Sequence, residues 1–101
     1  MPTNRMRPIH PGEVLREEFL VPLHMSPHAL ALALRVPASR INDIALGRRG
    51  VSADTAARLA RYFGTSAEFW LNLQAVYDLK TLPAARAIAE EIMPRKATAV
   101  G

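Results

Sequence analysis

Side chains that could contact nucleic acid gather in one short stretch of this 101-residue sequence. Asn42 can form two hydrogen bonds with adenine, and Arg40 can bind guanine or a phosphate. Ser39 lies near the expected start of a helix, where backbone N–H groups also favour phosphate. Asp43 is ambiguous, because it could accept a hydrogen bond from cytosine, orient Arg40, or repel DNA. The candidate DNA-contacting residues are Pro37, Ala38, Ser39, Arg40, Asn42, Asp43, Arg48 and Arg49.

A short helix that begins near Pro37 and runs to Leu46 is predicted to carry most of these side chains. When Ile41 and Ile44 face the core, the polar residues named above lie on the opposite face, with Arg40 on its flank. Gly47 suits the left-handed residue that ends a helix. Residues 47–50, two arginines between two glycines, are predicted to form a mobile basic loop that binds phosphate. The alternatives are a solvated helix face and a surface loop without a partner.

A second helix is predicted directly before this one, over residues 27–34. Ser26 can cap its amino end, and Pro27 suits the first helical position. The connection of about three residues is typical of a helix-turn-helix unit. Arg35 occupies a turn position where the backbone tends toward positive φ and glycine is common. An ordinary helical hairpin is the alternative, because either arrangement would bury the apolar residues at this spacing: Leu30, Leu34, Val36, Ile41 and Ile44.

The remaining sequence predicts further helices and no strands, so the expected fold class is all-α. Prolines and glycines bound helical segments over residues 12–21, 52–63, 66–80 and 83–93. We expect an N-terminal arm at 1–9, a helix-turn-helix domain at 10–80, and a C-terminal helix and tail at 81–101. The tail from Pro94 onward is expected to be frayed.

The net charge of the chain lies in its middle. Residues 35–64 contain six arginines and two aspartates, whereas basic and acidic residues balance on either side. The formal net charge of +4 therefore belongs to one block. A localised basic surface attracts polyanions, of which nucleic acid is the commonest in cells.

Other features of the composition exclude several classes of protein. The absence of cysteine rules out disulfides, zinc fingers and thiol catalysis. No apolar run is long enough to span a membrane, and no secretion signal begins the sequence, so a cytoplasmic protein is expected. His24 and His28 have metal-compatible spacing but no third ligand. We therefore expect no metal, no other cofactor and no enzymatic activity.

Six motifs follow one another in a characteristic order: His10–Glu13, Glu17–Leu23, Arg40–Ile44, Gly47–Gly50, Arg58–Ser66 and Phe69–Gln74. In this order they resemble the HigA/VapI group of antitoxins, which carry a Cro/C1-type (XRE) helix-turn-helix. The sharpest are Arg-Ile-Asn-Asp-Ile and Trp-Leu-Asn-Leu-Gln. This chain departs from the usual pattern at Arg35 and at His24–Met25, and its sequence after Lys80 is less distinctive.

The resemblance implies a lambda-repressor-like five-helix DNA-binding domain, here with a C-terminal helical extension. Such proteins form homodimers and repress their own operon by binding a palindromic operator. They also neutralise a HigB-like toxin, a ribosome-dependent mRNA endonuclease. In a dimer, the two reading helices would lie about 34 Å apart, on successive turns of one DNA face.

The helix over residues 66–80 gives a physical reason to expect a dimer. It carries more apolar side chains than one small core is expected to absorb, and an exposed share favours a two-fold interface. The predicted interface residues are Trp70, Leu73, Val76 and Tyr77. Trp70 fits the core as well as the interface, and the core is the favoured place for it.

Two other functions remain compatible with the sequence. The first is a stand-alone XRE-family transcriptional repressor without a toxin, which only the neighbouring genes could distinguish. The second is a protein-interaction module that does not use DNA. The excess of basic charge beside the predicted reading helix favours DNA over a basic protein partner.

Overall fold

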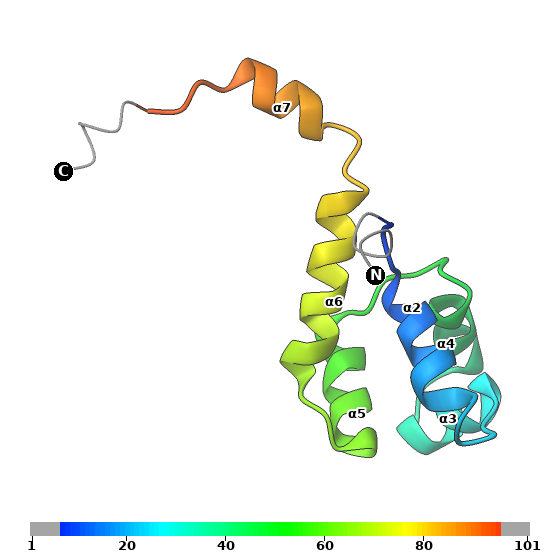
Figure 1. Cartoon of the computed structure of the whole chain (residues 1–101). Helices are drawn as coiled ribbons and strands as arrows, with labels where there is room; N and C mark the ends of the chain where they lie inside the picture. The colour runs from blue at the N-terminus through cyan, green and yellow to red at the C-terminus, as the bar shows by residue number, and fades with distance from the viewer. Residues whose placement is uncertain (1–6, 96–101) are drawn as a thin grey trace.

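The computed structural model describes residues 7–95, and within this range it contains helices and no strands (Figure 1). This confirms the predicted all-α fold class. The predicted N-terminal arm (1–9) and frayed tail lie largely outside the described residues. The helices are α2 (Pro11–Val14), η1 (Leu15–Leu20), α3 (Pro27–Leu34), α4 (Ala38–Ala45), α5 (Ala53–Phe63), α6 (Ala67–Lys80) and α7 (Ala85–Glu91).

Serines cap the amino ends of α3, α5 and α6, as was predicted for Ser26. Ser26 Oγ accepts a hydrogen bond from the Ala29 N–H at 3.0 Å, and Ser66 Oγ does the same for Phe69 at 3.0 Å. Ser52 caps α5 in the same way. Each hydroxyl satisfies a backbone donor that has no partner within its helix.

Left-handed residues end three of the helices. Gly64 ends α5 with φ +73°, and Gly47 follows α4 with φ +76°. Arg35 ends α3 with φ +60°, which confirms the positive φ predicted at this turn. A non-glycine residue pays about 1 kcal/mol for this conformation, but the turn it forms sets the direction of α4.

The first helix differs from its prediction. Residues 12–21 were expected to form one α-helix, but α2 continues into η1, whose backbone bonds join residues five apart. The Val21 N–H, for example, donates to the Arg16 carbonyl oxygen at 2.9 Å. Bonding of this kind aligns residues about five positions apart. Leu15 and Leu20 are therefore both buried in the core.

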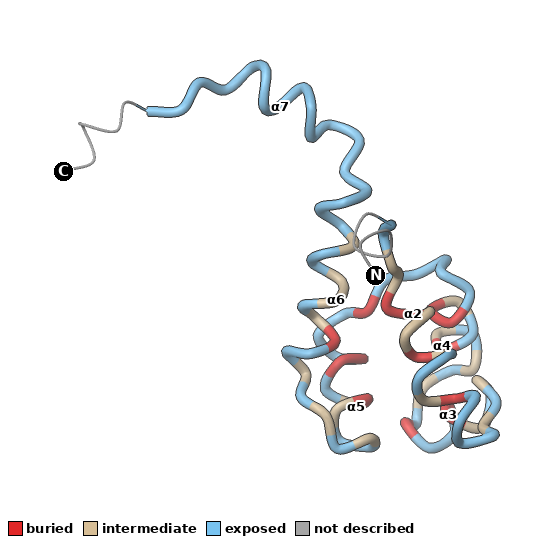
Figure 2. Tube along the Cα trace, viewed as in Figure 1, coloured by how far each residue is buried: buried red, intermediate tan, exposed pale blue. Residues whose placement is uncertain are grey.

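The core lies between the helix pair α3–α4 and the pair α5–α6, with α2 and η1 packed against both (Figures 1 and 2). Burial of its apolar side chains supplies the main stabilising free energy. The backbones of α2 and α4 approach closely at Gly12, where a Cβ would stand 1.8 Å from the Ile44 carbonyl oxygen. The largest fully buried side chains are Trp70, Leu15, Leu30, Ile41, Ile44 and Leu59.

Helix α7 stands apart from this core (Figure 1). Every residue from 81 to 95 is exposed, in contrast to the inward faces of α2 to α6 (Figure 2). None of the described helices combines the length and apolar character that crossing a membrane requires.

Candidate nucleic-acid interface

Helix α4 presents a polar face to solvent and an apolar face to the core. Ile41 and Ile44 are fully buried, as their spacing predicts. Ser39 and Asn42 are exposed on the opposite side. Both line a shallow cleft together with the first residues of α3. The amino ends of α3 and α4 therefore open onto one surface, and helix amino ends favour negative charge.

The side chain of Arg40 turns from α4 toward α5. Its Nη1 donates to Asp54 Oδ2 at 2.7 Å, and its side chain is 29% exposed. Asp54 also accepts from Arg58 Nε at 2.9 Å, and the Arg58 Nη1 donates to the Leu34 carbonyl oxygen at 2.9 Å. Hydrogen bonds from Arg58 and Arg40 lower the pKa of Asp54. Arg40 would have to exchange this partner for a base or a phosphate.

Asp43 does not orient Arg40, which was one of the three roles predicted for it. Within residues 7–95, the cation of Arg40 pairs with Asp54, so Asp43 does not orient it. The Asp43 carboxylate instead faces the two loop arginines, 3.9 Å from Arg48 Nη1 and 3.8 Å from Arg49 Nη2. Contacts of this length between exposed groups are weak. Asp43 is therefore placed to orient the basic loop without neutralising it strongly.

The basic loop is attached to the rest of the protein at both of its ends. The Arg48 N–H donates to the Asp43 carbonyl oxygen at 2.8 Å. Val51, which follows the loop, is 5% exposed, and its N–H donates to Gln74 Oε1 at 2.7 Å. The physical reason is that a buried valine and a buried N–H both need partners, and α6 supplies them. The Arg48 and Arg49 side chains remain exposed.

The sequence placed Gln74 in the Trp-Leu-Asn-Leu-Gln motif but assigned it no role in the site. Its Nε2 donates to Asp78 Oδ1 at 2.9 Å, which leaves Oε1 directed at the loop. The amide also packs against Gly50, where a Cβ would lie 3.0 Å from it. A larger residue at position 50 would therefore displace the amide from the loop.

His10 is the residue that caps the amino end of α2. Its Nδ1 accepts a hydrogen bond from the Gly12 N–H at 2.8 Å, which requires that this nitrogen carries no proton. The ring contacts Tyr77 edge-on, with centroids 4.8 Å apart. Burial lowers the pKa of His10, while the Asp78 carboxylate and a hydrogen bond to the Arg49 backbone oppose this shift. His10 thus joins α2, α6 and the basic loop.

Trp70 lies in the core of this chain, so it is not available as a residue of the predicted dimer interface. It is fully buried, and its indole N–H donates to Thr65 Oγ1 at 2.9 Å. Leu73 and Tyr77 are half-buried, whereas Val76 is 52% exposed. Leu79, which sequence reasoning did not single out, is 71% exposed on the same helix. The apolar surface of α6 available to a second copy therefore centres on Val76 and Leu79.

A pair of helices joined by a short turn, α3 and α4, with a polar outer face on the second and an arginine loop after it, defines a helix-turn-helix protein. Residues 15–70 match the model of the helix-turn-helix family. Virulence-associated protein I of Dichelobacter nodosus is 61% identical over 77 residues, which cover 76% of this chain and 71% of that protein. Antitoxin HigA-1 of Vibrio cholerae is 39% identical over 80 residues, or 78% of this chain and 74% of the relative.

Solved structures give the same result over more of the chain. The structure "Pseudomonas aeruginosa antitoxin HigA with higBA promoter" is 56% identical, with a TM-score of 0.85, and covers 89% of this chain and 100% of that one. The antitoxin GraA, solved in complex with its operator, is 46% identical, with a TM-score of 0.84, over 90% of this chain and 94% of its own. The chain therefore belongs to the helix-turn-helix family, in the group of HigA antitoxins.

Proposed function

We propose that this protein is a sequence-specific DNA-binding antitoxin that represses its own toxin–antitoxin operon and neutralises a HigB-like mRNA endonuclease. The observation that carries the proposal is the 56% identity, over 89% of the chain, to an antitoxin solved with its promoter. The exposed polar face of α4 supplies a surface for the same task. The proposed activity is binding and involves no catalysis. A protein with this role acts in the bacterial cytoplasm, where its DNA lies.

The proposal assigns a role to each exposed residue of the interface. Asn42 and Ser39 read base edges, with the amino end of α4 from Pro37 and Ala38 entering the major groove. Arg48 and Arg49 hold backbone phosphates, which position the protein without reading sequence. Arg40 contributes once DNA competes with Asp54 for its guanidinium group. Residues 10–80 form the DNA-binding unit, and residues 81–101 an extension of it.

A homodimer is part of the proposal. The outer face of α6 carries exposed Val76 and Leu79, and burial of this surface against a second copy would remove apolar area from water. Two-fold symmetry would present one α4 to each half of a palindromic operator. The toxin would bind a surface that leaves this arrangement intact or displaces it.

Footprinting on the DNA upstream of the protein's own gene tests the central claim. Wild-type protein should protect one symmetric site, and Asn42→Ala should weaken binding by about 1–3 kcal/mol and relax base preference. Co-expression with the neighbouring toxin gene tests the antitoxin role through restored growth. No protected site, or unchanged base preference in the variant, would contradict the proposed reading face.

A stand-alone repressor is the second candidate. An uncharacterized HTH-type transcriptional regulator of Escherichia coli, YbaQ, is 38% identical over 73 residues. The neighbouring genes distinguish the two functions: a protected operator with no toxin gene beside it would favour the stand-alone repressor.

A further inference from the structure

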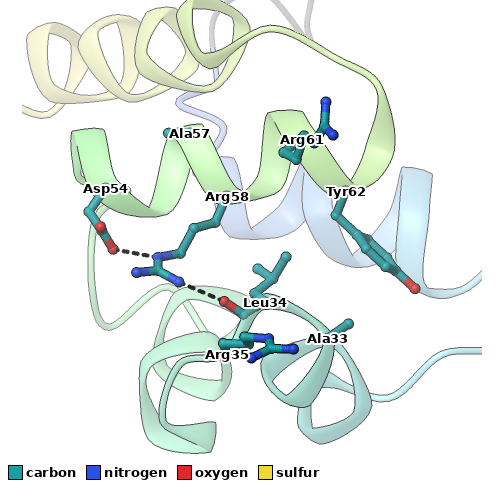
Figure 3. Close-up of a pocket in the computed structure, with 8 residues that line it drawn as sticks. All are labelled: Ala33, Leu34, Arg35, Asp54, Ala57, Arg58, Arg61 and Tyr62. Carbon is teal, nitrogen blue, oxygen red and sulfur yellow. Dashed lines mark hydrogen bonds and ion pairs between the residues drawn. The ribbon is translucent and has the colours of Figure 1, made fainter.

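Two grooves adjoin each other along α5. They start at residues assigned to DNA contact and extend away from the reading face of α4. The smaller groove begins beside α4 and the basic loop, and Arg40 and Arg49 line it. The larger groove, of about 540 Å³, lies between the end of α3 and α5 (Figure 3). Asp54 and Arg58 line both grooves, so the two form one continuous surface. We call this surface the arginine track, after its basic residues Arg35, Arg40, Arg49, Arg58 and Arg61.

The arginine track holds most of the net charge of the protein. Two carboxylates lie beside its five guanidinium groups: Asp54, which lines both grooves, and Asp43, 3.8 Å from Arg49 Nη2. The remaining excess of three positive charges is most of the formal net charge of the chain, +4. A concentration of one sign of charge on one side of a small protein attracts a polyanion and orients its approach.

The arginines of the track differ in what they already bind. Arg58 crosses the larger groove from Asp54 to the Leu34 carbonyl oxygen, as the dashed lines of Figure 3 show. In the part of the chain described here, the side chains of Arg35 and Arg61 form neither a hydrogen bond nor an ion pair. Both are exposed. They can therefore bind a ligand without breaking an existing contact.

We propose that the arginine track binds backbone phosphates of the same DNA duplex that α4 reads, with Arg35 and Arg61 as its phosphate ligands. This inference rests on the proposed function and extends the DNA contact surface beyond α4 and the basic loop. The planar guanidinium group suits phosphate oxygens. The track also includes Arg40 and Arg49, which border the reading helix.

The shape of the larger groove agrees with this ligand. Ala33 and Ala57 form part of its walls, and their small side chains allow a sugar–phosphate backbone to approach. Tyr62, 47% exposed, offers a hydroxyl that can donate to a phosphate. From Asp54 to Arg61, α5 rises about 10 Å. This is the axial length of about three base pairs, enough for more than one phosphate.

The test uses the full chain with Arg35→Asn and Arg61→Gln combined. Asparagine tolerates the left-handed backbone at position 35, and glutamine keeps the helix propensity of position 61. Binding to the footprinted operator and to an unrelated duplex of equal length is measured across salt concentrations. We expect affinity for both duplexes to fall by a similar factor. The slope of log affinity against log salt should decrease by about two, near 0.9 for each phosphate.

The controls separate this inference from the proposed function. Arg86→Gln removes an exposed arginine of α7, outside the track, and should leave the slope unchanged. If circular dichroism shows that the double variant folds poorly, the measurement is repeated with Arg61→Gln alone. The salt slope should then be smaller than that of the wild type by about one. A wild-type protein without preference for the operator would overturn the proposed function.

Three results would overturn the inference about the arginine track but not the proposed function, provided that the wild-type protein still prefers its operator. The first is an unchanged salt slope in the variants. The second is a changed base preference, which would mean that the track reads sequence. The third is unchanged DNA binding with loss of toxin binding, which would assign the groove to an acidic protein surface.

Discussion

Gln74 of α6 controls the position of the basic loop through one hydrogen bond, so we predict that Gln74→Leu destabilises the protein and weakens DNA binding. Leucine has a similar volume but no acceptor for the Val51 N–H, which lies 2.7 Å from Oε1. Val51 is 5% exposed, so water cannot easily replace the lost partner. The basic loop would then lose its attachment to α6.

The magnitude follows from the unsatisfied donor. A buried N–H without a partner costs about 1–3 kcal/mol. The second bond of Gln74, to Asp78, is exposed and adds little. We therefore expect the free energy of unfolding to decrease by about 1–3 kcal/mol. For a domain of this size, each kcal/mol lowers Tm by about 4–8 °C.

Urea unfolding and amide hydrogen exchange measure this effect, with Asn72→Leu as the matched control. Asn72 is an exposed residue of the same helix, and its replacement adds the same side chain. Gln74→Leu should accelerate exchange of the Val51 amide and lower DNA affinity evenly across sequences. Unchanged stability together with unchanged exchange at Val51 would refute the reasoning, because α6 would then not hold the loop.

Four other predictions concern the two glycines Gly12 and Gly64 taken together, His10, Val76 and Arg48. Gly12→Ala should lower the free energy of unfolding by about 1–3 kcal/mol or more, because its Cβ would meet a backbone oxygen at 1.8 Å. Gly64→Ala, with no atom within 4 Å of its Cβ but φ +73°, should lose only about 1 kcal/mol in the same urea titration. Burial lowers the pKa of His10, so the unfolded chain binds this proton first as pH falls. The stability due to His10 should be complete above its unfolded pKa of about 6.5 and decline below it. A His10→Asn variant should show less of this decline in unfolding measured against pH. Val76→Arg should convert a dimer to a monomer in sedimentation while circular dichroism stays unchanged. Arg48→Ala should weaken binding to all duplexes alike and reduce the salt slope by about one.

Each of these has an outcome that would contradict it. Equal losses at both glycines would mean that the approach of α2 to α4 is not tight. A pH profile unaffected at position 10 would remove His10 from the pH dependence. A dimer that persists in the position 76 variant would place the interface elsewhere, and a change of base preference at position 48 would make the loop a reader of sequence.

Local sequence determined where α3, α5 and α6 begin and where α3 and α5 end. Ser26, Ser52 and Ser66 each bond a backbone N–H only three residues away, so the cap needs no distant partner. The left-handed turn at Arg35 and the polar face of α4 follow from spacing in the same way. These features were predictable because their energies depend on neighbours within one or two helical turns.

Contacts between residues far apart in the chain were decided by the tertiary structure alone. Arg40 meets Asp54 and Val51 meets Gln74 only because α4, the loop, α5 and α6 pack at particular angles. The same packing buried Trp70. The spacing of residues along a sequence predicts which face of a helix is apolar. It does not predict which distant side chain will pack against that face. The sequence by itself therefore determined the helices and the candidate reading surface, and the packing of those helices decided which arginines are held and which remain exposed.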